Sequence, residues 1–77
     1  MNIGRFEYDS DRERWTVVDG DGEELLELHC GDTLVVRDMD DSDWFRGRIE
    51  LDSHMLWYMI MEDGQERDDF ELLDVQL

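Results

Sequence analysis

Apolar and polar residues alternate along most of the chain, and this period of two constrains the fold more than any other feature. In the segment WFRGRIEL (44–51), Phe45, Gly47 and Ile49 occupy alternate positions, and Arg46 and Arg48 lie between them. Successive side chains of a β-strand point to opposite faces, so such a segment forms a strand with one buried face. The pattern predicts an all-β protein.

Polar turns divide the chain into short strand-like segments. We predict five or six strands, and the segments with strand character are 5–9, 14–19, 24–28, 33–39, 44–51 and 56–62. The tail 68–77 is predicted to form a short helical turn followed by a last strand, and turns are expected at 19–22, 40–43, 52–55 and 63–64. Short strands at this spacing are typical of a small barrel or sandwich.

The expected core follows from the buried faces of these strands. A chain of 77 residues makes a single domain, and we predict that residues 1–77 form one small antiparallel barrel, since closure removes the exposed sheet edges that promote aggregation. Gly47 is expected where two strands pass closely, and Trp15 and Trp57 are expected to belong to the core. The side chains predicted to be mostly buried are Leu34, Val36, Phe45, Ile49, Trp57 and Ile60.

The location of the protein is predicted from features that the sequence lacks. The longest apolar run, residues 55–61, is far shorter than the ~20 residues of a membrane span. The first residues, MNIGRFEYD, lack the basic start and apolar stretch of a secretion signal, and the single cysteine allows no internal disulfide. These features predict a cytoplasmic protein with no membrane partner.

The stretch LHCGD (28–32) places His29 beside Cys30 and raises the question of a nucleophile or a metal site. Neighbouring acids raise the pKa of a thiol, and adjacent residues on a strand point to opposite faces, so a catalytic pair is disfavoured. Zinc requires three or four ligands, and the only soft ones here are Cys30, His29 and His54. We predict a turn, with Cys30 a buried, slowly reacting thiol and His29 pointing outward.

Other cofactors and catalytic centres are not expected either. The loops starting at residues 19 and 38 begin like calcium-binding loops but lack the Gly at position six and the Glu at position twelve. No catalytic constellation is recognisable. The sequence therefore predicts a protein that is not an enzyme and holds no metal or cofactor.

The charge is the feature that points to a function. Twenty-three Asp and Glu face seven basic residues, all Arg, for a net charge of −16. Spread over a compact diameter of roughly 30 Å, this approaches the charge density of duplex DNA. The segment 19–43 alone carries a net −9, with one Arg against ten acids. Direct nucleic-acid binding is disfavoured, because the Arg residues are dispersed among acids.

Two resemblances bear on the fold. ELHCGDTLVV followed by an acidic loop and SDWFRGRIE resembles the central half of Src-homology-3 (SH3) domains, and FEYD (6–9) is similar to their opening motif. The combination of LHCGD, RIE and WY, over residues 28–58, resembles a small domain family of unknown function from Gram-positive bacteria and their phages and conjugative elements. Both resemblances imply an SH3-like barrel. The Pro-x-Asn-Tyr element of the polyproline groove has no counterpart in residues 63–77.

We therefore predict a non-enzymatic, acidic module that binds a basic protein surface, most readily that of a nucleic-acid-binding protein. By analogy with small acidic proteins of phages and mobile elements, it would be a DNA mimic that occupies the nucleic-acid channel of a host defence protein, of the anti-CRISPR or anti-restriction type. On an SH3-like barrel the two acidic loops would lie beside one another and flank Trp44. The predicted partner-binding residues are Asp19, Asp21, Glu23, Glu24, Asp38, Asp40, Asp41, Asp43 and Trp44.

The alternative is an SH3-like accessory domain whose acidity serves solubility. A high net charge keeps proteins apart in solution through repulsion. Trp44 also has two readings, as an anchor on a ligand face or as an aromatic that covers the edge of the core. The sequence predicts neither the partner's identity nor the oligomeric state.

Overall fold

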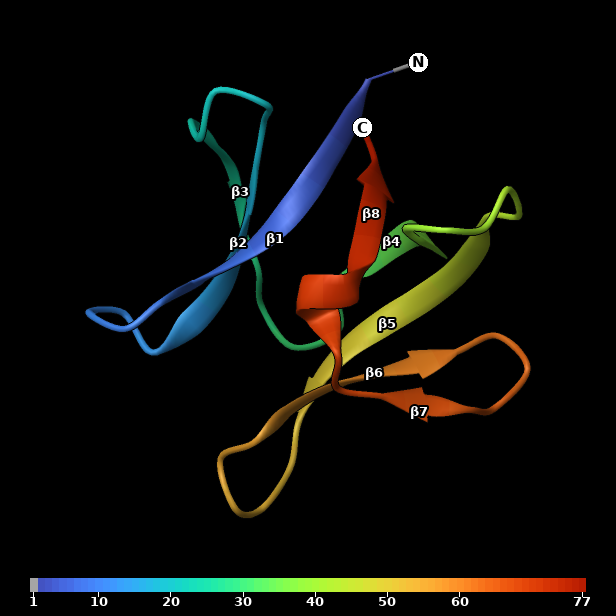
Figure 1. Cartoon of the computed structure of the whole chain (residues 1–77). Coiled ribbons are helices and arrows are strands. Elements are labelled where there is room, and N and C mark those ends of the chain that lie inside the picture. The colour runs from blue at the N-terminus through green and yellow to red at the C-terminus, as the bar shows by residue number, and fades with distance from the viewer. Residues whose placement is uncertain (1) are drawn as a thin grey trace.

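The computed structural model describes residues 2–77 and contains eight antiparallel strands and one 3₁₀ turn (Figure 1). The strands are β1 (Ile3–Asp9), β2 (Arg14–Val18), β3 (Glu24–Glu27), β4 (Thr33–Asp38), β5 (Phe45–Leu51), β6 (Trp57–Met61), β7 (Glu66–Arg67) and β8 (Leu73–Gln76). The 3₁₀ turn η1 (Phe70–Leu72) directly precedes β8, so the predicted helical turn and last strand are confirmed. The all-β prediction is also confirmed. The two-residue strand β7 was not predicted.

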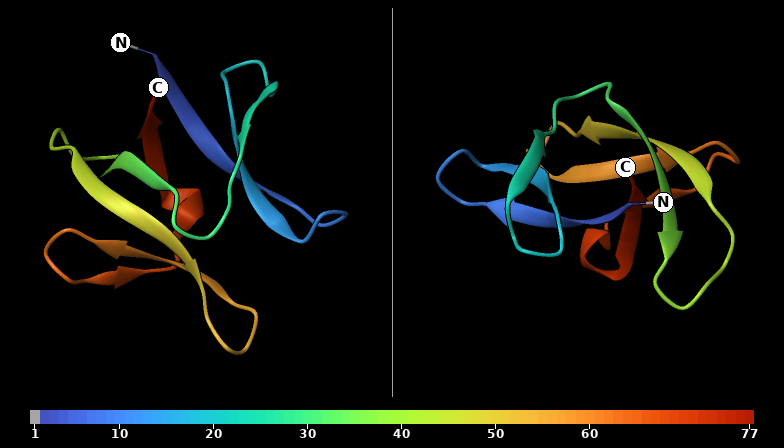
Figure 2. Two further views of the ribbon diagram at one scale, coloured as in Figure 1. Left: turned by 180° about the vertical axis from the view of Figure 1, so that it is seen from behind. Right: turned by 90° about the horizontal axis from the view of Figure 1, so that it is seen from above.

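All eight strands form one sheet in the order β3-β2-β1-β8-β4-β5-β6-β7. The last strand of the chain is therefore central, and it joins a meander of β1–β3 to a meander of β4–β7 (Figures 1 and 2). The predicted closed barrel is wrong, because β3 and β7 are free edges that pair with only one neighbour each. The prediction of five or six strands was correspondingly too low.

One apolar face of the curled sheet encloses the core. Phe6, Trp15 and Phe70 form an aromatic cluster, with the Phe6 and Phe70 rings 5.2 Å apart and the Trp15 and Phe70 rings 4.9 Å apart. Aliphatic and Met side chains from both meanders and from β8 pack against this cluster and bury the inner face almost completely. The most deeply buried of them are Val17, Leu28, Val36, Ile49, Met59, Leu73 and Val75.

The core prediction holds in part. Val36 and Ile49 are buried, whereas Leu34, Trp57 and Ile60 are only half-buried. Phe45 was predicted to be buried but remains 45% exposed. It is the first residue of β5 and pairs with Val36 of β4, but the ladder with β6 begins only at Gly47, so a neighbouring strand lies on one side of Phe45 alone.

The prediction for Gly47 is confirmed. A methyl group at this position would lie 2.6 Å from Cγ of Met59 and 3.1 Å from Sδ of Met61. Gly47 pairs with Met61 across the β5–β6 ladder, and the side chain of Met59 crosses directly over it. The absence of a side chain at Gly47 therefore lets the two Met side chains of β6 pack under β5.

Candidate functional site

The β2–β3 turn carries the first group of predicted partner-binding acids. Oδ1 of Asp19 accepts hydrogen bonds from the backbone N–H groups of Asp21, at 2.9 Å, and Glu23, at 3.0 Å, so the turn is closed by its own side chain. Gly22 has a φ of +82°, which other residues adopt only at a cost. No ion pair within residues 2–77 involves Asp21 or Glu23, and both are exposed. These two carboxylates are therefore available to a partner.

Glu24, in contrast, belongs to an internal charge network centred on Arg12. The Arg12 guanidinium pairs with Glu24, with Glu27 at 3.0 Å and with Asp9 at 2.6 Å. The hydrogen bond from Arg12 holds the pKa of the Asp9 carboxyl below its usual range. Docking through Glu24 would have to compete with Arg12, so this predicted residue is a poor contact.

The β4–β5 loop carries the second group of predicted acids. Oδ1 of Asp41 accepts hydrogen bonds from the backbone N–H groups of Ser42, at 2.7 Å, and Asp43, at 3.3 Å. This arrangement again fixes a loop by its own carboxylate. Asp40 and Asp43 are exposed, and neither takes part in an ion pair within the described residues.

Asp38 lies at the start of the same loop but is occupied by Arg67. Nη1 and Nη2 of Arg67 donate to the two oxygens of Asp38 at 3.0 and 2.7 Å, and Nη2 also donates to Asp69 at 2.6 Å. The hydrogen bonds from Arg67 lower the pKa values of the Asp38 and Asp69 carboxyls. Asp38 therefore stabilises the fold and is not a free docking group.

Trp44 is the last residue before β5 and is half-buried. The guanidinium carbon of Arg37 is 4.6 Å from the centre of the Trp44 ring, a cation–π distance, and Nε of Arg37 pairs with Asp74 at 3.1 Å. Arg37 of β4 therefore contacts the Trp44 ring and is itself held in place by Asp74 of β8. The contact with Arg37 leaves both readings of Trp44 open, as an anchor on a ligand face and as an aromatic at the edge of the core.

The two acidic loops do not lie beside one another, so that prediction is wrong. In the sheet order, β1 and β8 separate β2 from β4, and Figures 1 and 2 show the β2–β3 turn and the β4–β5 loop on either side of the chain termini. Only the β4–β5 loop adjoins Trp44. The expectation depended on the strand order of a closed SH3-like barrel, which this sheet does not have.

The LHCGD stretch is a turn, as predicted. Asp32 closes it by accepting a hydrogen bond from the backbone N–H of His29 at 2.8 Å, and Gly31 adopts a φ of +92°. The backbone of Gly31 and Asp32 is fixed to Ile49 of β5 by two hydrogen bonds of 2.8 Å. His29 is exposed as predicted, but Cys30 is also exposed, so its predicted burial is wrong. In this turn the alternation of a strand no longer decides which side chain points inward.

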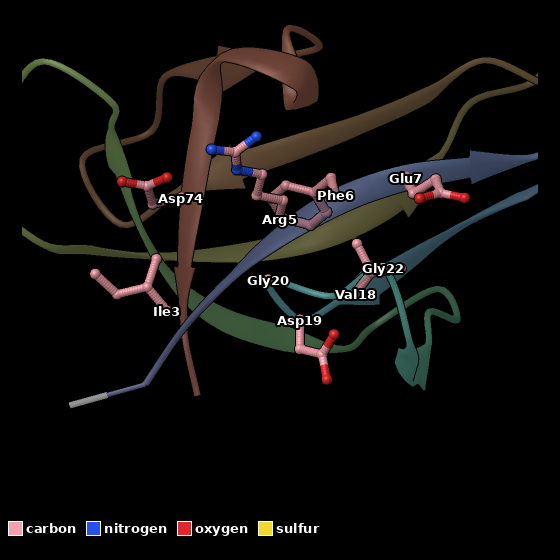
Figure 3. Close-up of a pocket in the computed structure, with 9 residues that line it drawn as sticks. All are labelled: Ile3, Arg5, Phe6, Glu7, Val18, Asp19, Gly20, Gly22 and Asp74. Atoms are coloured by element: carbon pink, nitrogen blue, oxygen red, sulfur yellow. The ribbon is translucent and has the colours of Figure 1, made fainter.

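A hollow of about 690 Å³ lies beside β1 and the β2–β3 turn (Figure 3). Arg5, Glu7, Asp19 and Asp74 line it, but their charged groups point in different directions (Figure 3). Catalytic sites bring a reactive group, a proton-transfer partner and a polarising group together around one point. Within residues 2–77 this hollow shows no such convergence.

In residues 2–77, no three His, Cys, Asp or Glu side chains are arranged to hold a metal ion. Among the same residues, no helix has the length and apolar character needed to cross a membrane.

Two features of the surface were missed in the sequence. The Arg12 and Arg67 networks join residues far apart in the chain, and no local pattern marks them. The other feature is the tip of the β5–β6 hairpin, where Met55 and Leu56 are exposed. The signal for the latter was present, because Met55 falls within the predicted turn 52–55, where an apolar side chain has no sheet face to join.

Comparison with known families adds one result. Residues 4–77 match the model of a domain of unknown function, DUF5348. The chain belongs to this family. The prediction of a small domain family of unknown function is thereby confirmed and extended from residues 28–58 to nearly the whole chain. No curated protein and no solved structure matches the chain.

Proposed function

We propose that this DUF5348 protein is a non-enzymatic binding module that docks through exposed carboxylates onto the basic surface of a nucleic-acid-binding protein. The observation that carries the proposal is the net charge of −16 on a molecule whose longest extent is 34 Å. This is about one net charge per 2 Å, against one per ~1.7 Å along duplex DNA. A protein surface that attracts DNA therefore attracts this molecule as well.

Four carboxylates are the best candidates for direct contact with the partner. Asp21, Glu23, Asp40 and Asp43 are exposed and free of internal ion pairs, and their loops are held in place by Asp19 and Asp41. Preorganised charges lose little conformational entropy on binding. The proposed contact set is therefore smaller than the set predicted from the sequence, since Glu24 and Asp38 are held by Arg12 and Arg67.

The mechanism we propose is competitive occupancy. The carboxylates take the places of nucleic-acid phosphates on the partner, and Trp44 supplies a flat aromatic surface next to Asp43. The association is fast and sensitive to salt, because exposed charges steer the encounter. A target in a host defence system, of the kind that phage-encoded DNA mimics block, is one partner of this chemistry.

A second candidate function is favoured by the open sheet. The edge strands β3 and β7 are unpaired on one side, and β3 carries Glu24 and Glu27 beside two exposed Leu residues. Charged residues on an edge strand oppose pairing with another molecule. In this alternative the acidity protects an accessory domain from aggregation and makes no specific contact.

The two candidates differ in where the charge acts. We would immobilise the protein, expose it to a bacterial lysate at low and at high salt, and challenge the captured proteins with duplex DNA. The test variant carries Asp21→Asn, Glu23→Gln, Asp40→Asn and Asp43→Asn. The matched control carries Glu7→Gln, Asp11→Asn, Glu13→Gln and Glu71→Gln, which remove the same charge from exposed positions outside both loops.

The proposal expects capture of a nucleic-acid-binding protein at low salt, its release by duplex DNA, and loss of capture in the loop variant but not in the control. Equal weakening in both variants would show that only total charge matters. If no captured protein binds nucleic acid, the proposed function is wrong and the solubility role remains.

A further inference from the structure

The tip of the β5–β6 hairpin presents two neighbouring apolar side chains to solvent. Met55 is 68% exposed and Leu56 64% exposed, the highest values among the large hydrophobic residues of the described chain. Figure 1 shows this hairpin tip at the end of the molecule away from both termini and from the β2–β3 turn. Single exposed apolar residues are common, but Met55 and Leu56 are adjacent and more exposed than the neighbouring pair Leu25 and Leu26 of β3.

The backbone of the tip is fixed, so the pair is presented in a defined position. Oδ1 of Asp52 accepts hydrogen bonds from the backbone N–H groups of His54, at 2.8 Å, and Leu56, at 2.9 Å. The backbone N–H of Asp52 donates to the carbonyl oxygen of Leu56 at 3.0 Å. At the base of the tip, the indole N–H of Trp57 donates to the carbonyl oxygen of Glu13 at 3.2 Å.

An open hollow of about 360 Å³ lies next to the tip. Leu56, Trp57, Tyr58, Glu66 and Asp68 line it. Trp57 packs toward the core, so the ring of Tyr58, on the opposite face of β6, is the aromatic surface available there. The remaining lining residues are Asp52 and Arg67. The charge of Arg67 is already balanced by Asp38 and Asp69, so the hollow and its surroundings are acidic.

The charge of the molecule decides what this apolar surface can receive. A second copy of the chain, an anionic lipid surface and a nucleic acid all carry negative charge, and each is repelled by a protein of net charge −16. A polypeptide with both basic and apolar side chains complements the charge and the apolar surface together. The side chain best suited to the hollow is Arg, whose planar guanidinium stacks on aromatic rings and pairs with carboxylates.

We propose that the hairpin tip and the adjoining hollow bind an Arg-containing, apolar segment of a partner protein. One apolar residue of that segment packs on Met55 and Leu56, and a neighbouring Arg lies against the ring of Tyr58 with its charge toward Glu66 and Asp68. This inference rests on the proposed function only in taking the partner to be a basic protein. It adds a second anchor, remote from the β2–β3 turn, that is specific for apolar side chains.

The test uses two short synthetic peptides of equal length and charge, one alternating Arg with Leu and one alternating Arg with Ser. Binding to the full chain is measured by titration calorimetry, and the contacted residues are mapped by backbone amide shifts in NMR spectra. The test variant is Met55→Gly combined with Leu56→Ser. Gly suits this position, because Met55 has a φ of +65°, so the variant is expected to fold. The control is Leu25→Ser, at an apolar residue of β3 that is 45% exposed.

The wild type is expected to bind the Leu peptide about tenfold more tightly than the Ser peptide, the size of effect that an apolar anchor produces. The tip variant should lose this preference and the Leu25→Ser control should keep it, with amide shifts specific to the Leu peptide centred on residues 52–58. The inference is overturned if the wild type shows no preference, if the tip variant keeps it, or if the shifts centre elsewhere. If the inference is overturned in one of these ways but the tip variant still binds the Ser peptide as tightly as the wild type does, the proposed function stands. Failure of both peptides to bind would count against both proposals.

Discussion

Arg67 of β7 donates two hydrogen bonds, of 3.0 and 2.7 Å, to the carboxylate of Asp38 of β4, although β5 and β6 lie between these strands in the sheet. The sheet curls enough for the Arg67 side chain to reach from β7 to β4, two strands that share no backbone hydrogen bonds. The same guanidinium also holds Asp69, just before η1. One Arg therefore links the edge strand, the end of β4 and the approach to the central strand.

Replacing this residue with Gln should weaken the fold. Arg67→Gln removes the charge-assisted bonds and leaves Asp38 and Asp69 without a cation. We expect the free energy of unfolding at pH 7 to fall by roughly 1 kcal/mol, because partly exposed ion pairs contribute about 0–1 kcal/mol each. Urea unfolding followed by Trp fluorescence measures the change. Arg48→Gln, which breaks the more exposed pair with Glu50, is the control and should have a smaller effect.

The effect of Arg67→Gln should depend on pH. Arg67 lowers the folded-state pKa values of the Asp38 and Asp69 carboxyls. A carboxyl with a depressed folded pKa stabilises the fold above its unfolded pKa of about 3.9, and this contribution is lost as the pH falls through the folded value. The difference in unfolding free energy between the wild type and the variant should therefore have its largest value at pH 7 and shrink below about pH 4. A difference that stays constant down to the acid transition would contradict the ion-pair account.

Gly47→Ala should be costly, because the new methyl group would clash with Met59, which is fully buried. We expect a loss of about 1–3 kcal/mol in unfolding free energy, the usual range for overpacking a core. Gly20→Ala provides the control, since nothing lies within 4 Å of the position where its methyl group would be. Chemical denaturation of both variants compares them directly. Equal stabilities would mean that β5 and β6 are not in close contact at Gly47.

Cys30 should react with thiol reagents in the folded protein at nearly the rate of the unfolded chain, because its side chain is exposed. A colorimetric thiol assay with and without urea measures both rates. Cys30→Ser should change stability by less than about 0.5 kcal/mol, as is usual for surface substitutions. Strong protection of the thiol in the native state would show that the turn is packed more closely than described.

The four-carboxylate loop variant should be at least as stable as the wild type at low salt. Asp21, Glu23, Asp40 and Asp43 have no internal cationic partner, so neutralising them relieves repulsion without breaking an ion pair. Each substitution is expected to raise the free energy of unfolding by less than about 0.5 kcal/mol. This increase should diminish as salt screens the repulsion between carboxylates. Thermal unfolding at several salt concentrations tests this. Asp38→Asn, at a paired acid, should instead destabilise, and a loss of stability in the loop variant would indicate undetected internal contacts.

Much of the strand arrangement could be predicted from the sequence because alternation is a local signal. Phe45, Gly47 and Ile49 do share one face of β5, as the spacing required. Closure of the sheet could not be predicted in the same way, since it depends on which distant strands become neighbours. The pairing of β8 with both β1 and β4 is not marked by any motif, and the resemblance to SH3 domains suggested a different order.

The candidate site was predictable in composition but not in arrangement. The acidic loops were found from their residues alone, and Asp21 and Asp40 are exposed as a docking role requires. Which acids are neutralised internally depends on tertiary contacts, such as that of Arg67 with Asp38 at a separation of 29 residues. Burial of Cys30 was misjudged for a related reason, because hydrogen bonds of Asp32 and Gly31 set the orientation of the turn.

The central position of β8 has a consequence for how the chain acquires its structure during synthesis. The β1–β3 and β4–β7 meanders pair neighbouring segments and close only short loops, so each is available early. Residues 73–76 emerge from the ribosome after both meanders, and only then can one strand bond to β1 and β4 together. Before that point the two meanders lack the strand that joins them in the finished sheet. Exposed apolar faces of incompletely folded chains promote aggregation, and a net charge of −16 opposes it through repulsion between neighbouring chains.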